Sequence, residues 1–384
     1  MTLPFGTSDG TLVENRPDTS LFGVSNTINV DQRLGHIPKA KRYPMPVMPP
    51  RFEPTFGRWN HYHLPSVDST DTNDYYPRVT TIGKTLDDTE FLDKWKTNKL
   101  IEGLATYPEI LDLVDPVLLS EGDPATMSLV ENLVERARVA VGTSNAANFG
   151  TAVHAWTEAV DHGLCRIVDV PIELRAHVAA YVYACRSAGI TAIPSLIERI
   201  IYNPYTGSAG RIDRISRMPD GTLVVLDVKT GKNIRNSVLG IGVQLAQYAT
   251  STHMLSEDGT HWETPPPMSQ TLAIVAHIPS NASAEDGGVP CELVDIDLER
   301  AIADMMASVD VRERRSGKKN LITGVRYRLV SDGAVSHVES EVWGHIQSAQ
   351  TAEHMRAIYA HYAQSWEPHF TEWGMARLRY LGIV

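Results

Sequence analysis

An acidic residue and a lysine stand two positions apart, at Asp227 and Lys229, in the run DVK. In a strand these two side chains would point to one face and Val228 to the other, because strand side chains alternate. The run PDG at 219–221 lies between stretches rich in branched residues and predicts a hairpin turn, since Asp and Gly tolerate a left-handed backbone. That hairpin would bring Asp213, on the preceding strand, beside Asp227 and Lys229.

Two adjacent carboxylates and a lysine suit chemistry on a phosphate ester. Carboxylates can share a hard divalent cation, Mg²⁺ or Mn²⁺, with waters and a phosphate oxygen. Such a cation and a lysine can activate a water and offset the negative charge of the transition state. We therefore expect Asp213, Asp227 and the carbonyl of Val228 to bind metal, and Lys229 to orient the water. Alone, the pattern equally fits an exposed hairpin with an acid and a lysine on its solvent face.

Separated pieces of the sequence stand in a characteristic order: GTAVH at 150–154, Glu198, GRID ending at Asp213, DVKTGK starting at Asp227, and QLAQY at 244–248. This order resembles the RecB-like branch of the PD-(D/E)XK nucleases. The resemblance implies that His154 contributes to one metal and that Asp213 and Asp227 are the main metal-binding acids. It also implies that Lys229 is the catalytic lysine and that Glu198 belongs to the catalytic set.

The resemblance places Gln244 and Tyr248 on a helix that helps to orient the site and the DNA. Their spacing of four residues agrees, because it puts both side chains on one helix face. Glu158 likewise lies four residues after His154 and would project beside it. Taken singly, each of these residues fits an ordinary structural role, so their joint order carries the hypothesis.

A looser resemblance extends to exonucleases encoded by bacteriophages. YPRVTTIG at 76–83, the helix with Trp95, and the strand and basic helix after Pro290 look like parts of those enzymes. The implied function is a metal-dependent DNA exonuclease in recombination, repair or phage DNA processing. Its partners would be linear duplex or single-stranded DNA, and a recombinase, a single-strand annealing protein or a helicase. Because the sequence has no GxxxxGK[ST] phosphate loop, any strand opening must come from a partner.

Two alternatives stay open at this stage. The first is an endonuclease of the same chemistry, such as a restriction or junction-resolving enzyme, because fold and site do not fix the substrate. The second is a non-catalytic subunit that binds DNA ends. The complete set of acids and lysine speaks against the second alternative, since binding alone does not require it.

The charge balance disfavours a protein that coats nucleic acid by bulk electrostatics. The 384-residue chain has 46 acidic and 35 basic residues, a formal net charge of −11. Phosphate neutralisation needs clustered Lys and Arg. One basic stretch could hold a DNA backbone, or could be a solvated helix end and loop: Arg312, Arg314, Arg315, Lys318, Lys319, Arg326 and Arg328.

No apolar run approaches the roughly 20 residues that a membrane helix needs, and the N-terminus lacks the features of a secretory signal. We therefore expect a cytoplasmic protein without a membrane partner, in the host cytoplasm if the chain is phage-encoded. The oligomeric state is left open.

The periodicity of the sequence predicts an α/β fold. Helical patterns cover 87–100, 126–141, 147–160, 174–188 and 238–254, and strand patterns cover 196–201, 211–217, 222–229, 272–278 and 292–298. With the resemblance, this predicts a restriction-endonuclease-like core with a mixed central sheet flanked by helices. The expected domains are an irregular N-terminal extension at 1–75, a nuclease domain at 76–310, and a basic segment with a C-terminal helical module at 311–384.

The cysteines predict that the protein holds no iron–sulfur cluster. Cys165, Cys185 and Cys291 are widely spaced and form no CxxC pair, unlike the four cysteines of CRISPR-associated relatives. The purified protein should be colourless and should keep its activity after thiol alkylation under native conditions. Stoichiometric iron and sulfide in an anaerobic preparation would contradict this expectation.

Overall fold

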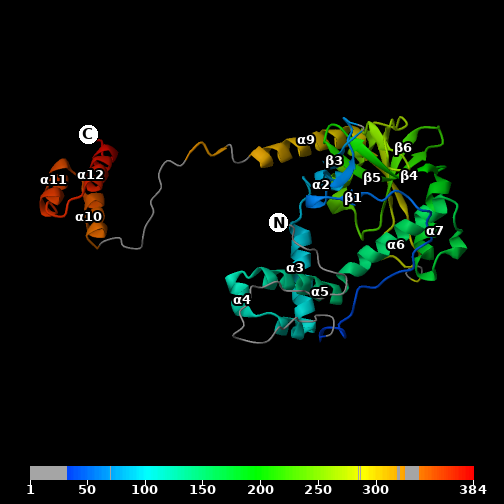
Figure 1. Ribbon diagram of the computed structural model, residues 1–384, viewed down its shortest axis with the longest axis horizontal. Coiled ribbons are helices and arrows are strands. Elements are labelled where there is room, and N and C mark those ends of the chain that lie inside the picture. Colours follow the sequence, from blue (N-terminus) through cyan, green and yellow to red (C-terminus); the bar gives the residue numbers. More distant parts are fainter. Residues whose placement is uncertain (1–32, 70, 284, 286, 318–320, 325–336) are drawn as a thin grey trace. The chain divides into compact units, whose positions relative to one another are not determined.

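The chain forms two compact units, divided after Ser316. The structure is a computed structural model, and it describes residues 33–69, 71–283, 285, 287–317, 321–324 and 337–384 (Figure 1). The sequence places the boundary of the last domain at residue 311. The division falls later because helix α9 (Leu298–Ser316) runs unbroken through that position.

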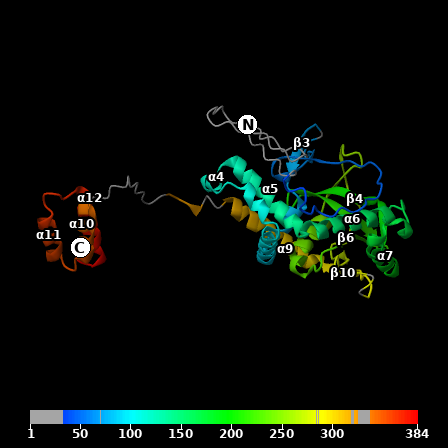
Figure 2. The ribbon, with the colours of Figure 1, turned by 90° about the horizontal axis from the view of Figure 1, so that it is seen from below.

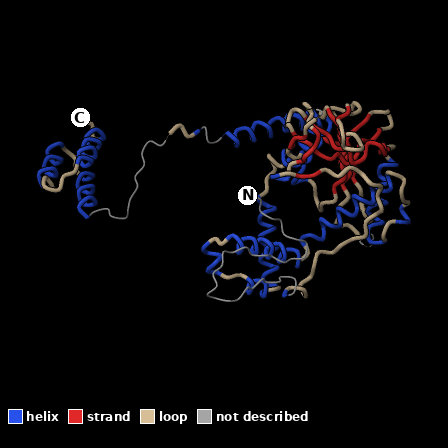
Figure 3. The backbone as a smooth tube through the Cα atoms, in the orientation of Figure 1, coloured by secondary structure: helices blue, strands red, loops and turns tan. Residues whose placement is uncertain are grey.

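A seven-stranded mixed sheet forms the centre of the first unit (Figure 3). Its order is β10-β9-β6-β5-β4-β7-β8, and of its neighbouring pairs only β6 and β9 are parallel. The expected hairpin joins β5 to β6, where Met218 N donates to Thr222 O at 2.8 Å. The strands are β4 (Thr191–Asn203), β5 (Ser208–Arg217), β6 (Leu223–Lys229), β7 (His253–Leu255), β8 (Trp262–Glu263), β9 (Leu272–His277) and β10 (Glu292–Asp297).

Helices cover both faces of this sheet, as can be followed in Figures 1 and 2. On one face α6 (Thr143–Asp161) and α7 (Ile172–Ser187) pack on Val224, Leu226 and Val228 of β6. On the other face Val225 packs among α2 (Val79–Gly83), α8 (Val238–Ala249) and α9. The predicted α/β fold, with a mixed central sheet flanked by helices, is confirmed.

The expectation of an irregular extension over residues 1–75 is wrong for part of that range. β1 (Thr55–Phe56), β2 (Tyr62–Pro65) and β3 (Asn73–Tyr76) form a small antiparallel sheet. Tyr62 and Leu64 alternate onto one face, and they pack there with Tyr76, Ile200 and Leu255. Burial of this apolar face holds the segment against β4 and β7. Residues 1–32 lie outside the described residues.

Two further helical groups complete the described chain. In the first unit, α3 (Glu90–Thr106) and α5 (Pro124–Ala140) contribute to a core that includes Leu34, Ile37, Leu133 and Ala137, and α4 (Pro116–Glu121) contacts α5. In the second unit, α10 (His337–Ser348), α11 (Ala352–His361) and α12 (Pro368–Tyr380) enclose a core of their own. Short 3₁₀ turns lie at Arg58–Asn60, Pro108–Leu113, Ile167–Asp169 and Arg235–Ser237. Within the described ranges, no helix has both the length and the apolar character needed to cross a membrane.

Candidate active site

Acidic residues lie at one level across three adjacent strands. The register of β4 and β5 places Glu198 opposite Asp213, and the register of β5 and β6 places Asp213 beside Asp227. Asp213 Oδ2 also accepts a hydrogen bond of 2.9 Å from the backbone N–H of Val228. The sheet therefore holds the carboxylates on rigid backbone and at close quarters.

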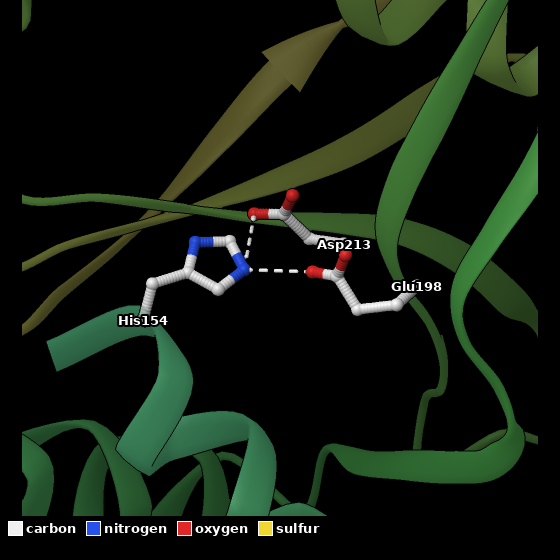
Figure 4. Close-up of side chains that lie close together, drawn as sticks. All are labelled: His154, Glu198 and Asp213. Atoms are coloured by element: carbon white, nitrogen blue, oxygen red, sulfur yellow. Dashed lines mark hydrogen bonds and ion pairs between the residues drawn. The ribbon is translucent and has the colours of Figure 1, made fainter. Parts of the chain in front are cut away.

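The backbone at Glu198 is bent out of regular strand geometry. Its φ of 56° lies in the left-handed region, which a residue with a Cβ adopts at a cost. The β4–β5 register shifts just before it, between Ala192 and Ile197. This irregularity aims the Glu198 carboxylate toward His154 in place of the direction that an ordinary strand would give (Figure 4).

Helix α6 supplies the imidazole of the site. His154 Nε2 lies 2.9 Å from Glu198 Oε1 and 3.7 Å from Asp213 Oδ2, as Figure 4 shows. One ligand atom from each of these three residues lies within 4.8 Å of the other two. This set of one nitrogen and two oxygen donors has the size and chemistry of a divalent-cation site.

Asp227 lies behind this triad and is almost completely buried. Its Oδ2 is in direct ion contact with the Lys229 ammonium, yet within the described part of the chain it has no partner in hydrogen-bond geometry. Its Oδ1 receives a long hydrogen bond of 3.4 Å from Gln244 Nε2 on α8. Gln244 also donates to the Tyr248 hydroxyl at 3.1 Å, and Tyr248 donates to the carbonyl of Arg211 at 2.9 Å.

Burial and charge crowding shift the pKa values of the group. Burial, reinforced by the charge of Asp213, raises the pKa of Asp227 to about 6, although Lys229 opposes the shift. Burial disfavours protonated His154, but the charge of Asp213 and the contact with Glu198 outweigh it and raise the His154 pKa. Burial likewise disfavours the charged form of Lys229, yet the charge of Asp227 raises the Lys229 pKa. The carboxylates thus repel one another and stabilise the protonated forms of His154 and Lys229 beside them.

A buried arginine ties α6 to the strand that carries Asp213. Arg214 is fully buried on the opposite face of β5, and its Nε donates to Asp161 on α6 at 2.5 Å. Its Nη2 donates to Thr157 Oγ1, also on α6, at 2.9 Å. Neighbouring residues of β5 therefore serve the site from both faces, because Asp213 lies in it and Arg214 fixes the helix that carries His154. The sequence alone did not reveal this role of Arg214.

Glu158 and Arg51 also belong to the neighbourhood of the site. Glu158 is buried one turn after His154, as the spacing of four predicts, and it is paired with Arg51. Arg51 comes from a proline-rich segment more than one hundred residues earlier in the chain. No spacing or motif linked that arginine to the acids, so sequence reasoning missed it.

The structure brings together His154, Glu198, Asp213, Val228 and Lys229 in the lining of one open pocket of about 570 Å³. Asp227, Gln244 and Tyr248 stand behind that lining. The role of the Val228 carbonyl as a metal ligand stays a prediction. Arg312, Arg314 and Arg315 lie on the last turns of α9 and are not part of the pocket lining, whereas Lys318, Lys319, Arg326 and Arg328 lie outside the described residues.

The residues present fit a divalent cation. The convergent ligand atoms of His154, Glu198 and Asp213, one nitrogen and two oxygens, are a donor set suited to Mg²⁺ or Mn²⁺. A comparison with protein-family models finds no match to this chain, and a comparison with curated proteins finds none either.

Gly150, the first residue of GTAVH, lets α6 approach the segment that follows β6. A Cβ at position 150 would lie 2.3 Å from Thr230 Oγ1. We expect Gly150→Ala to displace α6 and His154 and to weaken Mn²⁺ binding by about tenfold, although alanine ordinarily favours a helix by about 1 kcal/mol. Isothermal titration with Mn²⁺ measures the effect.

Two further variants test the cause of that effect. In Gly150→Ala combined with Thr230→Ala, Oγ1 is gone and the nearest remaining Thr230 atom is Cβ at 3.5 Å, so Mn²⁺ binding should recover. Gly344→Ala in α10 is the matched control, because no atom lies within 4 Å of its added Cβ. Wild-type Mn²⁺ affinity in Gly150→Ala alone would contradict the steric argument.

Proposed function

We propose that this chain is a divalent-metal-dependent deoxyribonuclease that hydrolyses phosphodiester bonds with Mg²⁺ or Mn²⁺. The observation that carries the proposal is the convergence of His154, Glu198 and Asp213 beside the buried Asp227–Lys229 pair. An ordinary exposed hairpin would leave its acid and lysine in solvent. Here Asp227 is 1% exposed and its carboxylate is held against other acids, an arrangement that costs stability and fits a role in binding.

Each side chain has a defined task in this mechanism. His154, Glu198 and Asp213, with Asp227 behind them, would hold the cation, which would supply charge stabilisation at the phosphate and a more acidic water. Lys229 would orient the attacking water and offset charge on the phosphate oxygens. Gln244 holds Asp227 from α8, and Tyr248 anchors Gln244 to β5 through the carbonyl of Arg211.

The proposal includes action on DNA ends. This exonuclease assignment rests on the resemblance to RecB-like and phage enzymes, and the basic residues at the end of α9 support it, since Arg314 and Arg315 are exposed there. A recombinase, a single-strand annealing protein or a helicase would supply the strand opening that the chain lacks. We assign the activity to the cytoplasm.

The metal and lysine roles predict different defects in two variants. Asp227→Ala should abolish Mn²⁺-dependent cleavage while the fold persists, because it removes a carboxylate that its neighbours repel. Lys229→Met should lower cleavage by about 10²–10³-fold yet keep Mn²⁺ binding, because lysine acts on water and phosphate. Cleavage of labelled DNA and Mn²⁺ titration separate the two. Near-normal cleavage by Asp227→Ala would defeat the metal assignment.

A comparison of linear and circular DNA tests the preference for ends. With Mg²⁺ or Mn²⁺, end-labelled linear DNA should be degraded progressively to short products while covalently closed circles persist, and chelation with EDTA should stop the reaction. Rapid linearisation of the circles, with survival of the linear product, would establish the endonuclease alternative. Binding to ends without cleavage under any of these conditions would establish the non-catalytic alternative.

A further inference from the structure

A proline-rich strap, defined as residues 44–53, crosses the rim of the site without helix or strand structure. At its start, Trp156 Nε1 on α6 donates to the carbonyl of Pro44 at 2.9 Å. At its end, Arg211 on β5 donates to the carbonyl of Phe52 at 3.1 Å and contacts Glu53. The strap is thus tied to the helix of His154 and to the strand of Asp213.

Between these anchors the strap inserts one cation among the acids. Arg51 Nη1 donates to Glu158 Oε1 at 2.7 Å and lies 3.8 Å from Glu198 Oε2. The carboxylates are nearly buried, with side-chain exposures of 5% and 12%, whereas the Arg51 side chain is 40% exposed. Arg51 Nε also donates to Glu53 Oε1 of the same strap at 3.0 Å. The exposed Arg51 side chain can therefore move without unpacking the core, whereas the two acids are held inside it.

Glu198 is shared between this arginine and the candidate cation site. Its Oε1 faces His154 and its Oε2 faces Arg51. A divalent cation at the triad would neutralise Glu198 and repel the guanidinium, since like charges a few ångströms apart inside a protein interact strongly. Arg51 and the metal are therefore competitors for the same negative charge.

Once released from the acids, the Arg51 guanidinium could bind a second anion, a phosphate of the DNA. Arg51 lines the same pocket as Lys229, where a scissile phosphate would lie. A guanidinium presents several N–H donors in one plane and pairs with phosphate oxygens by two hydrogen bonds at once. Arg51 can therefore pair with the acids before the metal binds, and with a phosphate of the DNA backbone afterwards.

We propose that Arg51 is an exchangeable cation of the site, bound to Glu158 and Glu198 without metal and transferred to a phosphate of the DNA when metal is bound. This inference rests on the proposed function, because it takes the metal site and the DNA substrate from it. It adds a residue from outside the sheet and α6, and it gives the strap a role in ordering metal and substrate binding.

The first test measures Mn²⁺ affinity in the absence of DNA. We expect Arg51→Gln to bind Mn²⁺ about tenfold more tightly than the wild type, because the competing charge is gone. Arg51→Lys, which keeps the charge, should stay closer to the wild type. Arg42→Gln removes the same charge nine residues earlier and should change little. Circular dichroism melting establishes that each variant is folded.

The second test measures DNA affinity in a Lys229→Met background, in which cleavage is suppressed. Fluorescence anisotropy with a labelled duplex is recorded with and without Mn²⁺. Adding Arg51→Gln should weaken DNA binding by about tenfold in Mn²⁺ and leave it nearly unchanged without metal. This dependence on metal separates exchange from a contact that Arg51 makes with DNA at all times.

The outcomes distinguish this inference from the proposed function. The exchange is overturned if folded wild-type and Arg51→Gln proteins bind Mn²⁺ with equal affinity. It is also overturned if Arg51→Gln weakens DNA binding equally with and without Mn²⁺. Failure of both proteins to bind Mn²⁺ overturns the exchange together with the metal site. A third outcome is that the Mn²⁺ and DNA affinities are as expected but the wild-type protein never cleaves DNA. That outcome would support the exchange and overturn the nuclease assignment.

Discussion

Repulsion among acids is the constraint on which this site depends. Glu198, Asp213 and Asp227 occupy one level of three adjacent strands, and Glu158 approaches them from α6. Carboxylates placed so close and so deep cannot all be charged without cations beside them. Burial, with a smaller contribution from the charge of Asp213, raises the Asp227 pKa to about 6 although Lys229 opposes the shift. Three cations offset this negative charge, and they come from three separate parts of the chain: Lys229, Arg51 and protonated His154.

The fold must therefore resist the tendency of these groups to separate. The hydrogen bond from Val228 to Asp213 fixes one carboxylate to the neighbouring strand. Arg214 clamps α6 to β5 through Asp161, and Gly150 lets the same helix reach Thr230. These contacts hold the acids in place although their charges repel one another. Rigid strands carry the acids, while the exposed strap carries the replaceable charge.

Local patterns in the sequence predicted the central part of this arrangement. Alternation in β6 placed Asp227 and Lys229 on one face, and helical spacing placed Glu158 beside His154 and Gln244 beside Tyr248. The positive φ of Glu198, the clamp of Arg214 and the insertion of Arg51 could not be predicted in this way, because they arise from contacts between distant segments. The small sheet of Tyr62 and Leu64 was missed because two-residue and four-residue strands among prolines give little periodic signal.

The proposed function requires a divalent cation in this cluster of acids. Anomalous diffraction from crystals soaked in Mn²⁺ tests it most directly, since the signal locates the metal without reference to activity. We expect one strong peak about 2.0–2.3 Å from ligand atoms of His154, Glu198 and Asp213, with Arg51 turned away from Glu198. A Mn²⁺ peak elsewhere in the protein, or none at saturating Mn²⁺ with His154 still on Glu198, would contradict it.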